Sequence, residues 1–142
     1  MPAGYSGTPL IRKLGIKENQ SILLYNPIEC YFSLFSELPL GLKLLAKTEP
    51  ESADFIHLFC KTFSELKDIS NIYKTALKKD GLMWVSWPKG GSNIPTDLKR
   101  DLIREHFLQL RLVDIKVAAI DVHWSGLKLV YRLNDRKEDV SI

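Results

Sequence analysis

The pattern of apolar and polar positions along the chain alternates between short apolar runs and amphipathic segments. The short runs are apolar on both alternating faces, which is typical of strands covered on both sides of a parallel sheet. The predicted strands are 22–25, 42–46, 53–60, 82–87, 112–120 and 127–133. Segments with helical spacing or helix-start residues lie between them, and the predicted helices are 8–15, 26–36, 62–79 and 96–110.

The strand 82–87 is the centre of this pattern. It is apolar apart from Ser86, and Pro88 ends its hydrogen-bonded pairing because proline has no N–H. In open α/β sheets, ligands bind beyond the carboxyl ends of the strands, so we expect the loop 88–92 to lie on the rim that binds a ligand.

The order of the elements predicts the fold class. Alternating strands and helices indicate an α/β protein with a three-layer, Rossmann-like, mostly parallel sheet of about six strands. The link 121–126 is too short for a crossover helix, so the last two strands form an antiparallel hairpin. We expect the last strand to lie between 82–87 and 112–120. The prediction is one domain, 1–142, with an N-terminal clip (1–15) and a flexible charged tail (134–142).

Composition excludes several classes of protein. The chain has 142 residues, of which 45% are hydrophobic and 26% charged, as in ordinary soluble domains. Its apolar runs are far shorter than the roughly 20 residues of a membrane span. The net charge of +3 is spread over several segments, which argues against nucleic-acid binding. Cys30 and Cys60 form no CxxC motif and no secretory leader is present, which predicts reduced thiols in the cytoplasm.

Three short features invite a chemical interpretation. The run from Lys89 to Ser92 contains two glycines that favour a phosphate, but the lysine precedes them, unlike in a P-loop. Thr96 and Asp97 are typical of a helix start, which is a simpler interpretation than a general base. His57 has no second ligand at metal spacing, so we interpret it as a hydrogen-bonded core residue and predict no metal site.

The hairpin combines Asp121, His123, Trp124 and Ser125, with Lys128 further along. Neighbouring residues of a strand point to opposite faces, so this group cannot form a nucleophilic relay. Geometry instead suggests that one pocket forms at the strand-end rim, in which Lys89 and Lys128 neutralise an anion beside Trp124. Its candidate ligand-binding residues are Tyr5, Ser6, Lys89, Ser92, Thr96, Asp97, Asp121, Trp124, Ser125 and Lys128. The alternative is that Trp124 packs in the core while the lysines lie in water.

Two resemblances add to this interpretation. The helix and strand around Leu77-Lys78-Lys79-Asp80-Gly81-Leu82-Met83-Trp84-Val85, together with Asp54-Phe55-Ile56 and the closing hairpin, resemble class I S-adenosylmethionine-dependent methyltransferases. That family has a glycine-rich turn after its first strand, where this chain reads Tyr25-Asn26-Pro27-Ile28-Glu29. It also has an acidic residue at the end of its second strand, where this chain has Ala46-Lys47-Thr48, with Glu49 as a weak substitute.

The second resemblance covers nearly the whole chain. The segments Gly4-Tyr5-Ser6-Gly7-Thr8-Pro9-Leu10 and Trp124-Ser125-Gly126-Leu127-Lys128-Leu129 resemble those of an uncharacterised bacterial family, a domain of unknown function. This resemblance implies a bacterial, cytoplasmic, single-domain protein and names no catalytic residue.

The sequence therefore supports two functions. The first is a non-catalytic module with a degenerate methyltransferase-like fold that binds a small anionic ligand or a protein partner and no cofactor. The alternative is an S-adenosylmethionine-dependent methyltransferase or another enzyme of unassigned reaction. The oligomeric state stays open.

Overall fold

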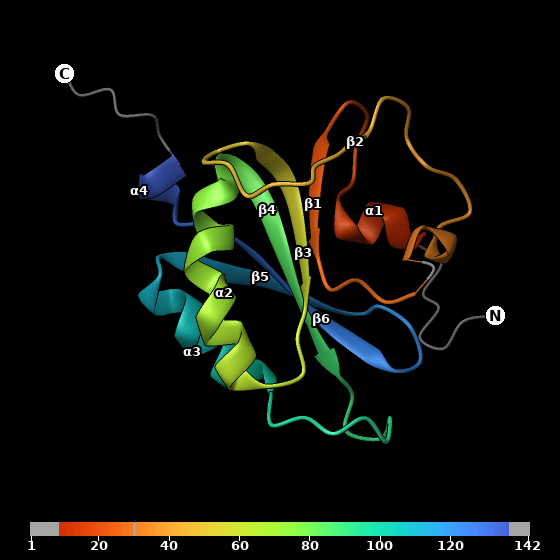
Figure 1. Ribbon diagram of the computed structural model, residues 1–142, viewed down its shortest axis with the longest axis vertical. Coiled ribbons are helices and arrows are strands. Elements are labelled where there is room, and N and C mark those ends of the chain that lie inside the picture. The colour runs from red at the N-terminus through yellow and green to blue at the C-terminus, as the bar shows by residue number, and fades with distance from the viewer. Residues whose placement is uncertain (1–8, 30, 137–142) are drawn as a thin grey trace.

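The computed structural model describes residues 9–29 and 31–136, which form a six-stranded sheet with helices on both faces (Figure 1). The order of the strands in the sheet is β2-β1-β3-β4-β6-β5. The strands are β1 (Ser21–Tyr25), β2 (Lys43–Leu44), β3 (Ala53–Phe59), β4 (Leu77–Pro88), β5 (Leu112–Ala119) and β6 (Trp124–Tyr131). The helices are α1 (Leu10–Leu14), the 3-10 helix η1 (Tyr31–Leu34), α2 (Phe63–Ala76), α3 (Arg100–Gln109) and α4 (Leu133–Arg136).

The pairing of the strands confirms the predicted fold class. Strands β2, β1, β3 and β4 are parallel, and β6 is antiparallel to both β4 and β5. The last strand therefore lies between the central strand and β5, as the sequence predicts. The connections through α2 and α3 link parallel strands, whereas the short β5–β6 turn links antiparallel ones.

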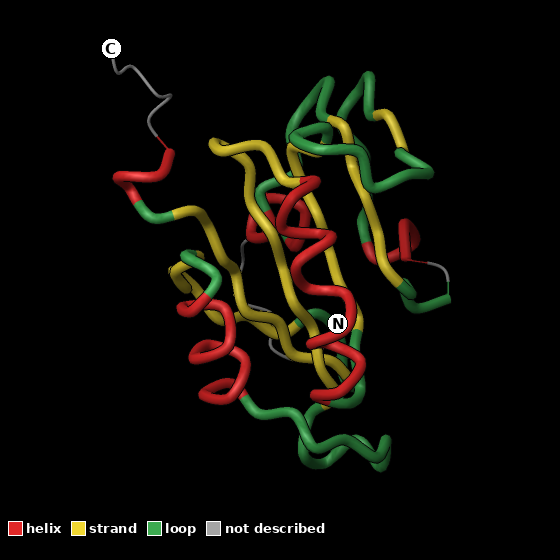
Figure 2. Tube along the Cα trace, turned by 60° about the vertical axis from the view of Figure 1, so that its left-hand side comes forward, coloured by secondary structure: helices red, strands yellow, loops and turns green. Residues whose placement is uncertain are grey.

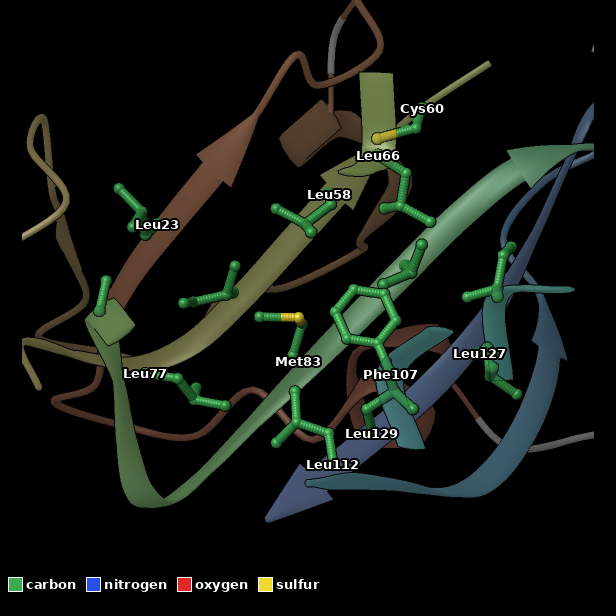
Figure 3. Packing of buried hydrophobic residues seen from close by; sticks show 14 of the residues in the cluster. Leu23, Leu58, Cys60, Leu66, Leu77, Met83, Phe107, Leu112, Leu127 and Leu129 are labelled. Atoms are coloured by element: carbon green, nitrogen blue, oxygen red, sulfur yellow. The ribbon is translucent and has the colours of Figure 1, made fainter. Parts of the chain in front are cut away.

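Helices α2 and α3 cover one face of the sheet, and α1 and η1 lie on the other (Figures 1 and 2). On the first face, Met83, Phe107 and Leu129 are fully buried in the larger apolar cluster, which Figure 3 shows at close range. On the second face, Leu14 and Trp84 are fully buried in a separate cluster. The sheet thus separates two cores, and the parity of a residue along its strand decides which core it joins.

The second face also holds α1 against the sheet. Trp84 donates a hydrogen bond from its indole Nε1 to the carbonyl of Leu14, over 2.8 Å. Gly15 ends the helix in the left-handed conformation with φ of 87°, and its N–H returns to the carbonyls of Ile11 and Arg12. Residues 9–15, the described part of the predicted N-terminal clip, therefore pack against the sheet.

Several predicted boundaries are wrong. The predicted helix 26–36 is only the 3-10 helix η1. Helix α2 ends at Ala76 rather than 79, because Leu77 pairs with Ala53 and begins β4. Helix α3 begins at Arg100 rather than 96. The second strand is shorter than predicted, and part of the predicted tail forms α4, where the Arg111 guanidinium donates two hydrogen bonds to the Asp135 carboxylate.

Within residues 9–29 and 31–136, none of the helices combines the length and apolar character that crossing a lipid bilayer requires.

Candidate functional site

A pocket of about 560 Å³ lies at the carboxyl end of β4. The strand ends at Pro88, and a loop then connects it to the first residue of α3 along the lower rim of the sheet (Figure 1). The lining residues are Trp87, Pro88, Lys89, Gly90, Asn93, Ile94, Pro95, Thr96, Leu98, Lys99 and Arg100. Sequence reasoning placed a ligand on this rim, and the pocket lies there.

The lining of the pocket is basic. Lys89, Lys99 and Arg100 contribute three cationic groups, and no acidic residue lines it. Arg100 forms an exposed ion pair with Asp101, with its Nε 3.3 Å from the carboxylate oxygen. In the described part of the chain, no carboxylate lies within 4.0 Å of the ammonium group of Lys89 or Lys99. Among the described residues, Lys89 and Lys99 therefore offer positive charge that no carboxylate neutralises by direct contact.

The N-terminus of α3 adds to this positive character. Lys99 is the N-cap residue, and its side chain makes no capping hydrogen bond. The first N–H groups of a helix carry partial positive charge and favour an anion when no side chain caps them. Asp101 in the first turn is the only acidic residue there.

The back of the pocket is apolar. Trp87 and Leu98 are buried members of the cluster beneath α2 and α3, and Ile94 is half-buried. A pocket with an apolar wall and cationic rim suits a ligand that has an apolar body and an acidic group.

Thr96 and Asp97 hold the loop in place through the start of the neighbouring helix. The Thr96 hydroxyl donates to the carbonyl of Lys61 over 2.6 Å, and the Asp97 carboxylate accepts from the N–H of Phe63 over 2.8 Å. Phe63 is the first residue of α2, so Asp97 caps α2 rather than its own helix. The prediction that these residues start their own helix is therefore wrong, since α3 begins at Arg100, although Asp97 does act as a helix cap.

The residues after Lys89 form a closed turn. Ser92 donates from both its N–H and its hydroxyl to the carbonyl of Lys89, over 3.0 and 2.7 Å, and its Oγ accepts from the N–H of Ile94. The N–H of Lys89 donates to the carbonyl of His123 over 2.8 Å. These bonds attach the loop to the β5–β6 hairpin and use the polar groups of Ser92 internally.

The hairpin lies beside this loop, but its side chains diverge. Asp121 accepts from the N–H groups of His123 and Trp124, over 2.8 and 2.9 Å, and so shapes the turn. Trp124 is 7% exposed and packs edge-to-face on Phe59, with ring centroids 5.3 Å apart, on the α1 face. Trp124 therefore packs in the core, which is the alternative to its predicted place in a ligand pocket.

Lys128 lies on that same face. It pairs with Trp84, and its Nζ is 3.4 Å from the position that a Cβ on Gly15 would occupy. Ser125 pairs with Trp87 and, by the alternation along β6, lies on the α3 face.

The structure thus brings together only part of the predicted set of ligand-binding residues. Lys89 and Thr96 line the pocket, and Ser92 and Asp97 stabilise its loop. Trp124 and Lys128 lie on the other face, because the parity of β6 turns their side chains away from α3. The remaining predicted residues are Asp121 and Ser125, which lie in the hairpin, and Tyr5 and Ser6, which lie outside the described residues.

Sequence reasoning missed Lys99 and Arg100. Their helical spacing placed them on the exposed side of a longer helix, whereas they stand at its start. The only sequence feature that could have indicated them is a pair of basic residues shortly after Asp97, near the predicted helix start at the carboxyl-end rim of the sheet.

His57 is a satisfied core residue, as predicted. Its Nδ1 is 2.8 Å from the Tyr31 hydroxyl and its Nε2 is 2.7 Å from the Ser86 hydroxyl, and the ring is fully buried. Burial lowers the pKa of His57 to about 3, so the imidazole is neutral. No group of three possible metal ligands occurs among the residues the structure describes.

Cys60 is a buried free thiol. Burial first and then the charge of Glu65 raise the pKa of Cys60 to about 12, which keeps the thiol protonated and unreactive. Cys30 lies outside the described residues.

Comparison with solved structures identifies the fold. An S-adenosylmethionine-dependent methyltransferase from Aquifex aeolicus is similar with a TM-score of 0.60 and 11% identity, over 84% of this chain and 86% of that one. The tRNA methyltransferase TrmK of B. subtilis has a TM-score of 0.55 and 9% identity, over 93% of this chain and 67% of that one. The O-methyltransferase NcsB1 of neocarzinostatin biosynthesis, in complex with S-adenosylmethionine, has a TM-score of 0.56 and 10% identity, over 92% and 51%.

This chain therefore has the fold of class I S-adenosylmethionine-dependent methyltransferases. At these identities the likeness concerns the fold alone. No family model matches the sequence, and no curated protein matches it either. The resemblance of its two signature segments to a bacterial family stays a prediction.

The residues at the usual cofactor position of this fold do not fit S-adenosylmethionine in the way the fold family implies. The turn after β1 contains Asn26, with φ of 50°, and Pro27 in place of glycines that let the backbone approach a ligand. Tyr25 donates from its hydroxyl to the Glu65 carboxylate over 2.8 Å, so these two groups satisfy each other. Burial first and then Glu65 raise the pKa of Tyr25 to about 12, which keeps the phenol as a donor. In that family an acid at the end of the second strand holds ribose hydroxyls, whereas here β2 ends at Leu44 and the next residues are Leu45, Ala46 and Lys47.

Proposed function

We propose that this protein is a ligand-binding module with a methyltransferase-like fold, and that the pocket at the end of β4 binds a small anionic molecule. The observation that carries the proposal is the cationic lining of the pocket, in which Lys89, Lys99 and Arg100 stand without an acidic lining residue. We also propose a cytoplasmic location, since the free thiol of Cys60 suits a reducing compartment.

The arrangement of the pocket explains what each part would do. Lys89 and Lys99 would face the acidic group from opposite ends of the loop, and the uncapped start of α3 would donate N–H groups to it. The apolar wall of Trp87, Ile94 and Leu98 would cover the body of the ligand. The lining offers no pair of side chains in which a base could activate a nucleophile, and so the proposal assigns no reaction to this pocket.

The test is a thermal-shift screen of small organic anions on the wild type, on Lys89→Ala and on Lys43→Ala. Lys43 is an exposed residue on the edge strand β2, does not line the pocket, and serves as the control. We expect at least one carboxylate or phosphate to raise the melting temperature of the wild type and of Lys43→Ala. That anion should bind Lys89→Ala about tenfold more weakly, because the variant lacks one charge-assisted contact. An anion that stabilises all three proteins equally, or a panel without any stabilising anion, contradicts the proposal.

A second candidate function is an S-adenosylmethionine-dependent methyltransferase or another enzyme of unassigned reaction. The similarity of the fold to methyltransferases favours this candidate. It would require a cofactor site that uses the turn at Asn26 and Pro27 in a way that differs from the glycine-rich turns of that fold family.

Isothermal titration calorimetry with S-adenosylmethionine and S-adenosylhomocysteine separates the two functions. Because the turn after β1 lacks glycine and Glu65 is already bonded to Tyr25, we expect neither compound to bind at micromolar concentration. Micromolar binding of either one would favour the methyltransferase over the binding module.

A further inference from the structure

Two lysines lie side by side on the α1 face of the sheet, away from the pocket. Lys116 of β5 pairs directly with Lys128 of β6 in the antiparallel register. Directly opposed residues project to the same face with Cβ atoms about 5 Å apart, and like charges in that position destabilise the pair. The chain therefore keeps a locally unfavourable pair, which is typical of functional positions.

A β-bulge creates this pair. Asp114 pairs with Leu129, and the register then shifts so that Lys116, rather than Ile115, opposes Lys128. Without the shift, Lys116 would oppose Leu127 and point to the α3 face. Bulges are known to redirect side chains near sites of function, and this one places a second ammonium group beside the first.

A third lysine completes the group. Lys17 follows the end of α1, and together with Lys116 it contributes to lowering the pKa of Lys128, after the larger effect of burial. The Nζ of Lys128 lies close over the backbone of Gly15, two residues before Lys17. Among the described residues, no carboxylate lies within 4.0 Å of the ammonium group of any of these three lysines.

We propose that Lys17, Lys116 and Lys128 form a binding site for the phosphate or pyrophosphate group of a small molecule. An anion with two or more charges would bind between the opposed ammonium groups. Its oxygens would accept hydrogen bonds from both groups, and its negative charge would offset the repulsion between them. Lys17 would close the site from the α1 side. Half-buried Lys128 would contribute most, because its charge is the least screened by water.

This site is independent of the pocket at the end of β4. None of the three lysines lines the pocket, whose buried residues Trp87 and Leu98 join the α3 side of the sheet, whereas Lys128 pairs with Trp84 and lies on the α1 side. The two sites can therefore be tested separately by substituting one lysine in each.

The test is a titration with pyrophosphate, monitored by calorimetry and by NMR spectra of the backbone amides. The variants are Lys128→Met and Lys116→Met, which keep an apolar side chain, with Lys43→Met as the control and Lys89→Met as the probe of the pocket. We expect Lys128→Met and Lys116→Met to weaken binding by about five- to tenfold, whereas Lys43→Met leaves this affinity unchanged. The amides of Gly15, Lys116 and Lys128 should shift in the wild type.

Two results overturn the proposal. The first is a wild type that does not bind pyrophosphate at millimolar concentration. The second is an equal loss of affinity in Lys43→Met or a loss confined to Lys89→Met, since either would place the anion elsewhere. A separate readout needs no ligand: relieving the repulsion in Lys116→Met should raise the melting temperature of the free protein by about 1–4 °C.

Discussion

Replacing His57 by leucine is expected to lower the free energy of unfolding by about 2–5 kcal/mol. The leucine would leave the hydroxyls of Tyr31 and Ser86 buried without their partner, since both are bonded to the imidazole. Burial raises the pKa of the Tyr31 phenol far above its usual range, so it cannot escape the penalty by ionising. Urea unfolding at neutral pH measures the loss.

A triple variant separates the hydrogen bonds from the packing. Tyr31→Phe and Ser86→Ala in the background of His57→Leu remove the two stranded hydroxyls, so the triple variant should regain part of the lost stability. If His57→Leu unfolds at the same denaturant concentration as the wild type, the hydrogen-bonded group contributes nothing and this account is wrong.

The same histidine predicts how stability depends on pH. Burial lowers its pKa to about 3 in the folded protein, against an ordinary value of 6.5 in an unfolded chain, so between these values only the unfolded state binds the proton. Stability is therefore fully present above pH 6.5 and falls as the pH drops toward 3, by about 2 kcal/mol between pH 7 and pH 5. His57→Leu should lack this loss. His106, whose pKa is also lowered by burial, contributes equally to both proteins and cancels in the difference.

The architecture was predictable because it depends on local patterns. The runs 53–60 and 82–87 are apolar on both faces, which predicts doubly covered strands, and both are central in the sheet. Thr62 and Glu65 predict the start of α2, and the N–H of Glu65 does donate to the Thr62 hydroxyl over 3.1 Å. The short link 121–126 predicts the antiparallel hairpin from length alone.

The misplaced elements depend on contacts between distant residues. Leu77 fits the helical spacing of α2, but its pairing with Ala53 starts a strand instead. Tyr31 reads as part of a longer amphipathic helix, yet its hydroxyl reaches His57 in the centre of the sheet. Asp97 has the chemistry of a helix cap, but no local pattern can say that it caps the helix before it in the chain.

The candidate site was predictable only to the level of the rim. Lys89 lies at the carboxyl-end rim of the sheet because it directly follows β4, and it lines the pocket found there. Lys128 does not, because residue parity along β6 turns it to the opposite face. The bulge at Ile115, which brings Lys116 to Lys128, has no signal in an apolar-polar pattern because both registers alternate equally well.

Gly126 offers the second large effect. A Cβ at this position would lie 2.9 Å from both the Cδ1 of Ile120 and the Cε3 of Trp84, closer than real Cβ atoms approach. Trp84 is fully buried and its indole is fixed by the hydrogen bond to Leu14, so the ring has no room to yield. We expect Gly126→Val to cost about 2–4 kcal/mol, because overpacking of a close-packed core forces the strand or the ring to shift.

Gly91→Val is the matched control for this substitution. Nothing lies within 4 Å of a Cβ at Gly91, in the exposed loop after β4, so the same change there should alter the free energy of unfolding by less than about 0.5 kcal/mol. Urea unfolding of the two variants at neutral pH gives the comparison. If the close contact between β6 and Trp84 causes the loss of stability, Gly126→Val should be much less stable than Gly91→Val. Equal stabilities of the two variants would show that Trp84 can move aside. Because Gly126 pairs with Ala118 of β5, a variant that loses this contact should also release the amides of the hairpin to faster hydrogen exchange than those of β3.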